Sequence, residues 1–99
     1  MAQRRTRPRE LTTPSDTQLL RLAAARLNEG KIAVNLNAGK LWMKYGEDVD
    51  LLTIRFKENP YPDEGDADLL AGIVYNYEGE NLVSVEILDI TDRFTEQTA

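Results

Sequence analysis

The hydrophobic pattern of this chain changes its period once, at Gly30, and this change limits the possible folds more than any other feature. Before it, apolar residues recur at the spacing of one helix face, at Leu20, Ala23, Ala24 and Leu27. After it, apolar residues alternate along the chain, first at Ile32, Val34 and Leu36. Because helices repeat about every 3.6 residues and strands every two, the chain is predicted to form one helix followed by strands.

The ends of the predicted helix are marked by local signals. Ser15 and Gln18 have the spacing of a capping box, in which each side chain bonds the other residue's backbone amide. Gly30 is suited to end the helix because it tolerates positive φ. The helix is therefore expected to begin after Ser15 and to end before Gly30.

The rest of the chain is predicted to form strands, at residues 31–36, 40–45, 51–57, 71–77 and 82–90. The first two would make a hairpin, with Ile32–Leu36 as an exposed edge strand. Residues 58–69 hold two prolines and a glycine and are predicted to be a long loop. We therefore expect an α+β domain: one N-terminal amphipathic helix packed on a four- to five-stranded antiparallel meander sheet. The expected boundaries are a disordered basic arm at 1–14, a single domain at 15–94 and a disordered tail at 95–99.

Composition excludes several kinds of chemistry. The 99 residues include no cysteine and no histidine. Disulfides, thiolate or histidine-dependent catalysis and ordinary zinc sites are therefore excluded. Residues 1–10 lack the apolar stretch of a secretory signal, and no apolar run is long enough to span a membrane. A cytoplasmic protein that uses no cofactor and contacts no membrane is expected.

The charge is divided unevenly along the chain. The net charge is −5, but residues 1–44 carry +6 and residues 45–99 carry −11. Such asymmetry fits a basic arm that binds phosphate, an acidic body that binds a basic partner, or good solubility alone.

Two blocks of sequence carry a family resemblance. They are Tyr45–Phe56 and Gly72–Thr91, and the run Val85-Glu86-Ile87-Leu88-Asp89 is the most specific part. Over about residues 41–94, the chain resembles a small prokaryotic family, domain of unknown function 2283. Gly46 stands where an Asp is usual, and Ser84 replaces a Gly. The resemblance supports the sheet and implies no activity, because none is assigned to the family. Some members are thought to sit beside a small toxin-like gene, which implies at most an antitoxin-like role.

Carboxylates suggest three further hypotheses. Four of them crowd one short stretch, at Asp63, Glu64, Asp66 and Asp68. They could hold Ca²⁺ or Mg²⁺, but the spacing does not match an EF-hand, so a solvated acidic surface that could meet a partner is favoured. Glu86 with Asp50 could do acid–base work. The favoured alternative is that Asp48 or Asp50 caps a turn while Glu86 faces water or pairs with Arg55, so no catalytic residue and no metal ligand is expected.

Basic residues suggest nucleic-acid binding. The arginines of the arm could neutralise phosphates, helped by basic residues of the helix and hairpin and by one tryptophan: Arg4, Arg5, Arg7, Arg9, Arg21, Arg26, Lys40, Trp42 and Lys44. The alternatives are a solubilising tail and, for Trp42, a core position beneath the helix with the lysine stems beside it.

Three functional hypotheses remain. The first is a non-catalytic protein-interaction module, antitoxin-like or self-associating. The second is a nucleic-acid-binding protein that uses the arginine arm and the basic helix and hairpin. The third, a metal-dependent enzyme, is the weakest because the sequence offers no nucleophile paired with a base.

Overall fold

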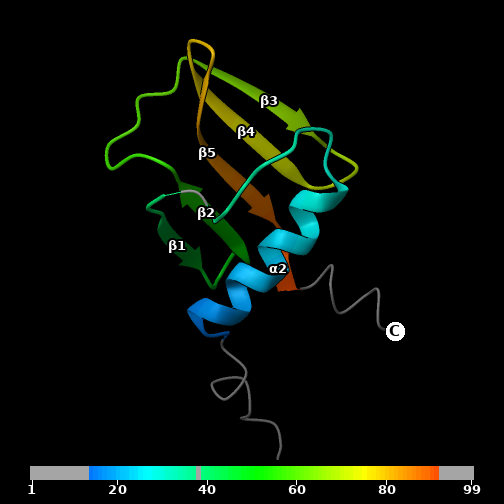
Figure 1. Ribbon diagram of the computed structural model, residues 1–99. Coiled ribbons are helices and arrows are strands. Elements are labelled where there is room, and N and C mark those ends of the chain that lie inside the picture. The colour runs from blue at the N-terminus through cyan, green and yellow to red at the C-terminus, as the bar shows by residue number, and fades with distance from the viewer. Residues whose placement is uncertain (1–13, 38, 92–99) are drawn as a thin grey trace, which may run out of the picture.

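The fold is one helix packed on one face of a five-stranded antiparallel sheet (Figure 1). The computed structural model describes residues 14–37 and 39–91. The elements are α2 (Asp16–Glu29), β1 (Trp42–Gly46), β2 (Leu51–Arg55), β3 (Glu64–Asp68), β4 (Ile73–Glu78) and β5 (Asn81–Leu88). The predicted α+β class, with an antiparallel sheet and a preceding helix, is confirmed.

Both ends of α2 lie where the sequence predicts, although Gly30 is extended and does not adopt positive φ. The Gln18 backbone amide donates to Ser15 Oγ at 3.2 Å, and the Ser15 amide donates to Gln18 Oε1 at 2.9 Å. Together these two bonds complete the capping box. Gly30 caps the other end and donates its amide to the Leu27 carbonyl at 3.1 Å.

The strand order is β1-β2-β5-β4-β3, and all neighbours are antiparallel. Sequential pairing holds within β1–β2 and within β3–β4–β5, so the sheet is a meander in these two parts only. Between the parts, β2 pairs with β5, with Leu52 opposite Ile87 and Ile54 opposite Val85. β5 therefore lies at the centre of the sheet, as its apolar residues on both faces predict.

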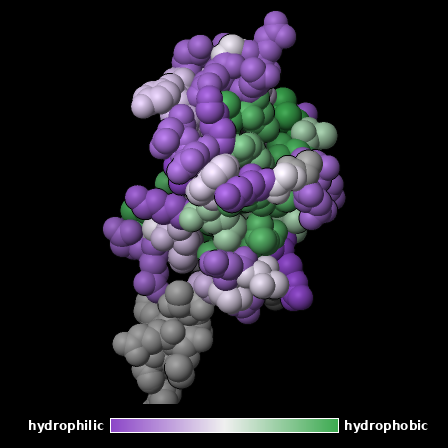
Figure 2. All heavy atoms as spheres, turned by 60° about the vertical axis from the view of Figure 1, so that its left-hand side comes forward, coloured by the Kyte–Doolittle hydropathy of each residue, from purple (hydrophilic) through white to green (hydrophobic). Residues whose placement is uncertain are grey.

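The core lies between α2 and one face of the sheet. Helix residues Leu19, Ala23 and Leu27 are buried there. The buried sheet residues alternate along their strands and are Leu52, Ile54, Ile73, Tyr75, Val83, Val85 and Ile87. Further apolar residues pack around the core but are only half-buried. On the side turned forward in Figure 2, apolar residues accordingly gather in a central area bordered by hydrophilic ones.

The predicted strand at 31–36 and its hairpin with 40–45 are wrong. Residues 31–37 are extended, and their exposure alternates as in a strand, with Ile32, Val34 and Leu36 half-buried. They join no strand, however, and run across the sheet face beside α2 (Figure 1). The alternation shows only that one side of the segment is buried. A segment that packs on the face of a sheet and a strand that pairs within a sheet both produce this pattern. The observed edge strands are β1 and β3.

The predicted loop at 58–69 is also partly wrong, because β3 lies inside it. β3 pairs with β4 along its length, from Glu64 opposite Tyr77 to Asp68 opposite Ile73. Its acidic sequence and glycine are unusual for a strand in general but typical of an edge, where charge discourages pairing with other chains.

Residues 1–13 of the predicted arm and the whole predicted C-terminal tail lie outside the described residues, as do Arg4, Arg5, Arg7 and Arg9. Within residues 14–37 and 39–91, no helix is long and apolar enough to cross a membrane.

Candidate functional site

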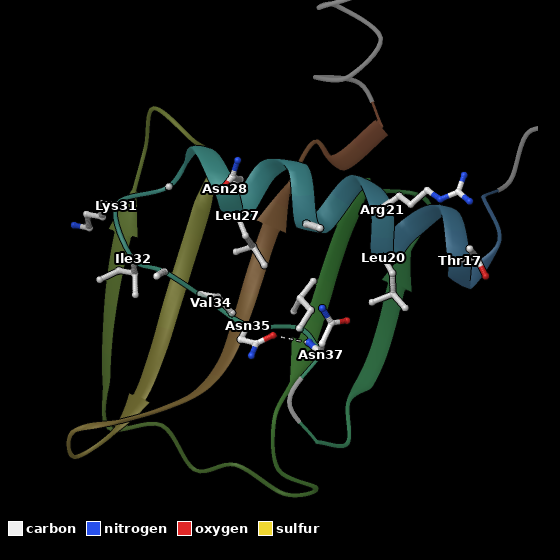
Figure 3. Close-up of a pocket in the computed structure, with 14 residues that line it drawn as sticks. Thr17, Leu20, Arg21, Leu27, Asn28, Lys31, Ile32, Val34, Asn35 and Asn37 are labelled. Atoms are coloured by element: carbon white, nitrogen blue, oxygen red, sulfur yellow. Dashed lines mark hydrogen bonds between the residues drawn. The ribbon is translucent and has the colours of Figure 1, made fainter.

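A groove runs between α2 and the extended segment 30–37 (Figure 3). We call it the α2 groove; its volume is about 670 Å³. Its apolar walls come from both sides, with Leu20, Ala24 and Leu27 on the helix and Ile32, Val34 and Leu36 on the segment. Leu20 and Leu27 point from the helix toward the segment in Figure 3. The groove exists because segment 30–37 packs beside the helix instead of joining the sheet.

The rim of the α2 groove is polar and carries positive charge. Its polar side chains are Thr17, Arg21, Asn28, Lys31, Asn35 and Asn37. The set includes two cations and no carboxylate, although the described domain as a whole is acidic. Apolar walls with a few polar groups at the rim are typical of a site that binds an apolar chain segment with polar or acidic ends.

The extended segment has unpaired backbone along the groove. Among the described residues, no backbone–backbone hydrogen bond involves Ile32–Leu36. The bend after it is fixed locally, because the Asn37 amide donates to Asn35 Oδ1 at 2.9 Å (Figure 3). Exposed, extended backbone of this kind can accept another strand.

Lys31 anchors the segment to β3. Its Nζ donates to Asp66 Oδ1 at 2.9 Å, and its backbone amide donates to Asp68 Oδ2 at 3.0 Å. The bond to Asp66 raises the pKa of Lys31, and desolvation opposes this effect. Two of the four carboxylates predicted to form an acidic partner surface therefore hold the segment in place.

A second anchor lies at Gly30. The Tyr75 hydroxyl, on β4, packs against Gly30 so closely that a β-carbon would have no room. Tyr75 is completely buried, and its hydroxyl makes no hydrogen bond with the described residues. Burial raises the pKa of Tyr75.

Two leucines stand out from the surface at the β3–β4 turn. Leu69 is 88 % exposed and Leu70 is 90 % exposed. The turn that carries them is rigid: the Gly72 amide donates to the Asp68 carbonyl at 2.9 Å, and Ala71 is buried. We call this pair the leucine knob. Sequence reasoning missed it because Leu69 is the last residue of the predicted loop and Leu70 falls between that loop and the predicted strand.

Arg26 is buried, although the sequence placed it among residues that could contact nucleic acid. It is 4 % exposed and donates to the carbonyls of Leu88 at 2.7 Å and Asp89 at 2.9 Å. Longer bonds reach the carbonyls of Ala71 and Ile90. Arg26 thus fastens α2 to the end of β5 and does not face a partner.

The remaining basic candidates are divided between two faces. Trp42 and Lys44 alternate with core-packed residues of β1 and lie on the sheet face opposite the helix, across from Arg55 and Thr53. Trp42 is therefore not beneath the helix, and Lys40 Nζ lies 5.5 Å from its ring centroid. Arg21 lies on the helix side, at the groove. The structure does not bring these residues onto one surface.

The acidic residues of β3 form no metal centre in the described part of the chain, where no group of three or more Asp or Glu side chains is arranged around one point. The Gly79 amide donates to the Asp63 carboxylate, while Glu64 is exposed beside a shallow hollow of about 320 Å³. These groups line the outer edge of the sheet.

Asp50 and Glu86, the candidate acid–base pair, each accept hydrogen bonds from other side chains. The carboxylate of Asp50 accepts bonds from the Tyr45 hydroxyl at 2.8 Å and the Thr91 hydroxyl at 2.9 Å. Burial, together with the bond to Asp50, raises the pKa of Tyr45. Glu86, which was expected to face water or to pair with Arg55, accepts a bond from Asn76 at 3.0 Å. Asp50 thus ties the β1–β2 turn to the end of β5.

Comparison with known proteins assigns the sheet to a protein family. A family model described as a protein of unknown function, DUF2283, matches residues 42–90. This part of the chain belongs to the DUF2283 family. The match covers all five strands, whereas α2 and segment 30–37 lie outside it. Neither a search of curated proteins nor a search of solved structures gives a match. The DUF2283 sheet supplies the leucine knob, and both walls of the α2 groove come from residues that precede the matched region.

Proposed function

We propose that this chain is a non-catalytic protein-interaction module whose α2 groove binds an apolar segment of a protein partner. The observation that carries the proposal is the groove itself, with seven apolar residues in its walls and a rim that holds Arg21 and Lys31 but no carboxylate. An apolar groove rimmed by polar groups is the common form of a peptide-binding site.

The groove favours a partner segment in an extended conformation. In the described part of the chain, Ala33–Leu36 makes no backbone–backbone hydrogen bond, so its backbone offers donors and acceptors along one wall. Main-chain pairing supplies affinity in strand addition. Alternate side chains of the bound segment would enter the apolar space, and an acidic residue would lie near Arg21. The proposal includes an antitoxin-like role and a cytoplasmic location.

Nucleic-acid binding is the second candidate, and one observation favours it. Lys40 lies over the ring of Trp42, and Lys44 shares that sheet face. Bases stack on exposed aromatic rings, but a single half-buried ring is a small platform. Retention of a single-stranded oligonucleotide that falls steeply as salt rises would support this candidate.

The test is selection of peptides from a displayed random library on the wild-type protein. Selected peptides are expected to bind at least about tenfold more weakly to Ala24→Arg, which places a charged side chain in the groove. Ala25→Arg is the matched control: Ala25 is the next residue on α2, is exposed and does not line the groove. Peptides that bind both variants equally well, or no selected peptides at all, would contradict the proposal.

A further inference from the structure

The leucine knob and the α2 groove are complementary features of one molecule. The knob presents two large apolar side chains that are almost fully exposed, at 88 % and 90 %. Adjacent exposed apolar residues mark interaction sites more often than single exposed ones do. The groove is an apolar hollow of about 670 Å³ that the described residues leave open.

The charges beside the knob and at the groove rim are opposite in sign. The knob directly follows the acidic strand β3, which carries Glu64, Asp66 and Asp68. The groove rim carries no carboxylate, and its Lys31 is paired with Asp66 of its own chain, so Arg21 supplies the positive charge of the rim. An approaching β3–β4 turn from another molecule would therefore bring negative charge toward a positive rim.

The knob and the groove also lie next to each other in the fold. Lys31, at one end of the groove, donates its backbone amide to Asp68, which immediately precedes the knob. Two features that adjoin on one side of a molecule can meet reciprocally across a two-fold axis. Such an arrangement closes with two copies and leaves no free knob to extend into a fibre.

We infer that the leucine knob of one copy of this chain inserts into the α2 groove of a second copy, and that two such contacts form a two-fold dimer. The inference rests on the proposed function of the groove and names its occupant. The turn is held by the bond from the Gly72 amide to the Asp68 carbonyl and by the bond from the Ala71 amide to Asp68 Oδ1 at 3.3 Å, so little conformational freedom is lost on binding. Because each contact is small, a dimer that dissociates in the micromolar range is expected.

Sedimentation equilibrium of the full chain tests the dimer. The wild type should shift from monomer to dimer as its concentration rises. Leu69→Asp combined with Leu70→Asp removes the knob, and Ala24→Arg blocks the groove. Each should raise the dissociation constant at least about tenfold. Val49→Asp, at an exposed apolar residue in the β1–β2 turn, and Ala25→Arg are controls that should leave it unchanged.

Mixing the two disabled proteins gives the sharpest result. The knob variant keeps its groove and the groove variant keeps its knob, so the mixture should form a heterodimer through one intact contact. This heterodimer should be tighter than either variant's self-association. A wild type that stays monomeric, or a dimer that neither variant weakens, would overturn the inference.

The peptide selection, compared with the oligomeric state of the wild type, separates this inference from the proposed function. If the wild type is monomeric but selected peptides bind in a manner that depends on Ala24, the second copy is the wrong occupant and the groove proposal stands. If the peptides also fail to distinguish Ala24→Arg from Ala25→Arg, both proposals are wrong. Circular dichroism of each variant confirms that it is folded, which is expected because all the substituted residues are exposed.

Discussion

The hydroxyl of Tyr75 on β4 packs directly against Gly30, and this contact fixes where the chain leaves α2 and begins the wall of the groove. Any side chain at residue 30 would collide with it. Gly30 is extended, with φ −80° and ψ 168°, so glycine is needed there for space and not for positive φ. The sequence argument for a glycine at this position was thus correct about the helix end but wrong about the reason.

Gly30→Ala should lower the free energy of unfolding by about 1–3 kcal/mol, as overpacking of a tight core contact does. Denaturant unfolding measures this loss of stability. Gly65→Ala is the control, because a β-carbon there would make only an ordinary contact with Asn76. Combining Gly30→Ala with Tyr75→Phe should restore most of the loss, since the hydroxyl is then absent. If the double variant is as unstable as Gly30→Ala, the Tyr75 contact is not the cause.

Tyr75→Phe alone should leave stability unchanged or raise it by up to about 1 kcal/mol. A buried hydroxyl without a hydrogen-bond partner is desolvated without compensation, and phenylalanine removes it with little change of shape. Thermal or denaturant unfolding checks this. A loss of more than about 1 kcal/mol would mean that the hydroxyl makes a stabilising bond.

Arg26→Met should destabilise the fold by about 2–4 kcal/mol, because the carbonyls of Leu88 and Asp89 would lose a charged donor while remaining near the core. Arg21→Met, five residues earlier on α2, replaces an exposed arginine and should change stability by less than about 0.5 kcal/mol. Equal effects of the two substitutions in urea unfolding would contradict the role assigned to Arg26.

Asp50→Asn should lower the free energy of unfolding by about 1–3 kcal/mol. The carboxylate accepts from Tyr45 and Thr91, and an amide replaces one acceptor by a donor that faces these donors. Asparagine tolerates the positive φ of Asp50, 53°, so backbone strain does not contribute. Asp48→Asn, at an exposed position in the same turn, is the control. Urea unfolding of both variants tests the prediction, and similar stability would contradict it.

Stability should depend on pH through Glu78. The Tyr61 amide and then Lys57 Nζ, at 2.9 Å, stabilise its charged form, so the pKa of Glu78 lies below its ordinary value of 4.5. A carboxyl with a lowered pKa in the folded state stabilises the fold above its unfolded pKa, and this contribution is lost as pH falls through the folded pKa. The difference in stability between wild type and Glu78→Gln should therefore be present at neutral pH and disappear as pH falls through the lowered pKa of Glu78 in the folded state. A difference that persists at low pH would contradict this assignment.

The elements with strong local signals were predictable. The capping box of Ser15 and Gln18 formed as the sequence indicates, because its bonds involve residues three apart. The alternation at Ile32, Val34 and Leu36 correctly identified the buried side of the segment. It could not show whether that side packs on a sheet or forms part of one, since burial has the same period in both cases.

The rest depended on contacts between residues distant in sequence. β3 is a strand because β4 pairs with it, and its own acidic residues give no such signal. Arg26 is buried because the carbonyls of Leu88 and Asp89, more than sixty residues later, turn toward it. The α2 groove and the leucine knob were not predicted, since one arises between two segments and the other from the exposure of a turn that only the folded chain defines.

The placement of one copy's knob in another copy's groove can be measured directly by paramagnetic relaxation enhancement. The chain has no cysteine, so a spin label attached at Ala67→Cys, an exposed position beside the knob, is unique. Labelled protein is mixed with ¹⁵N-labelled wild type. Amides that line the groove, at Ala24, Asn28 and Val34, should broaden, while Thr53 on the opposite sheet face should not. Broadening at Thr53 but not at the groove, or none at concentrations where the protein is dimeric, would contradict the account.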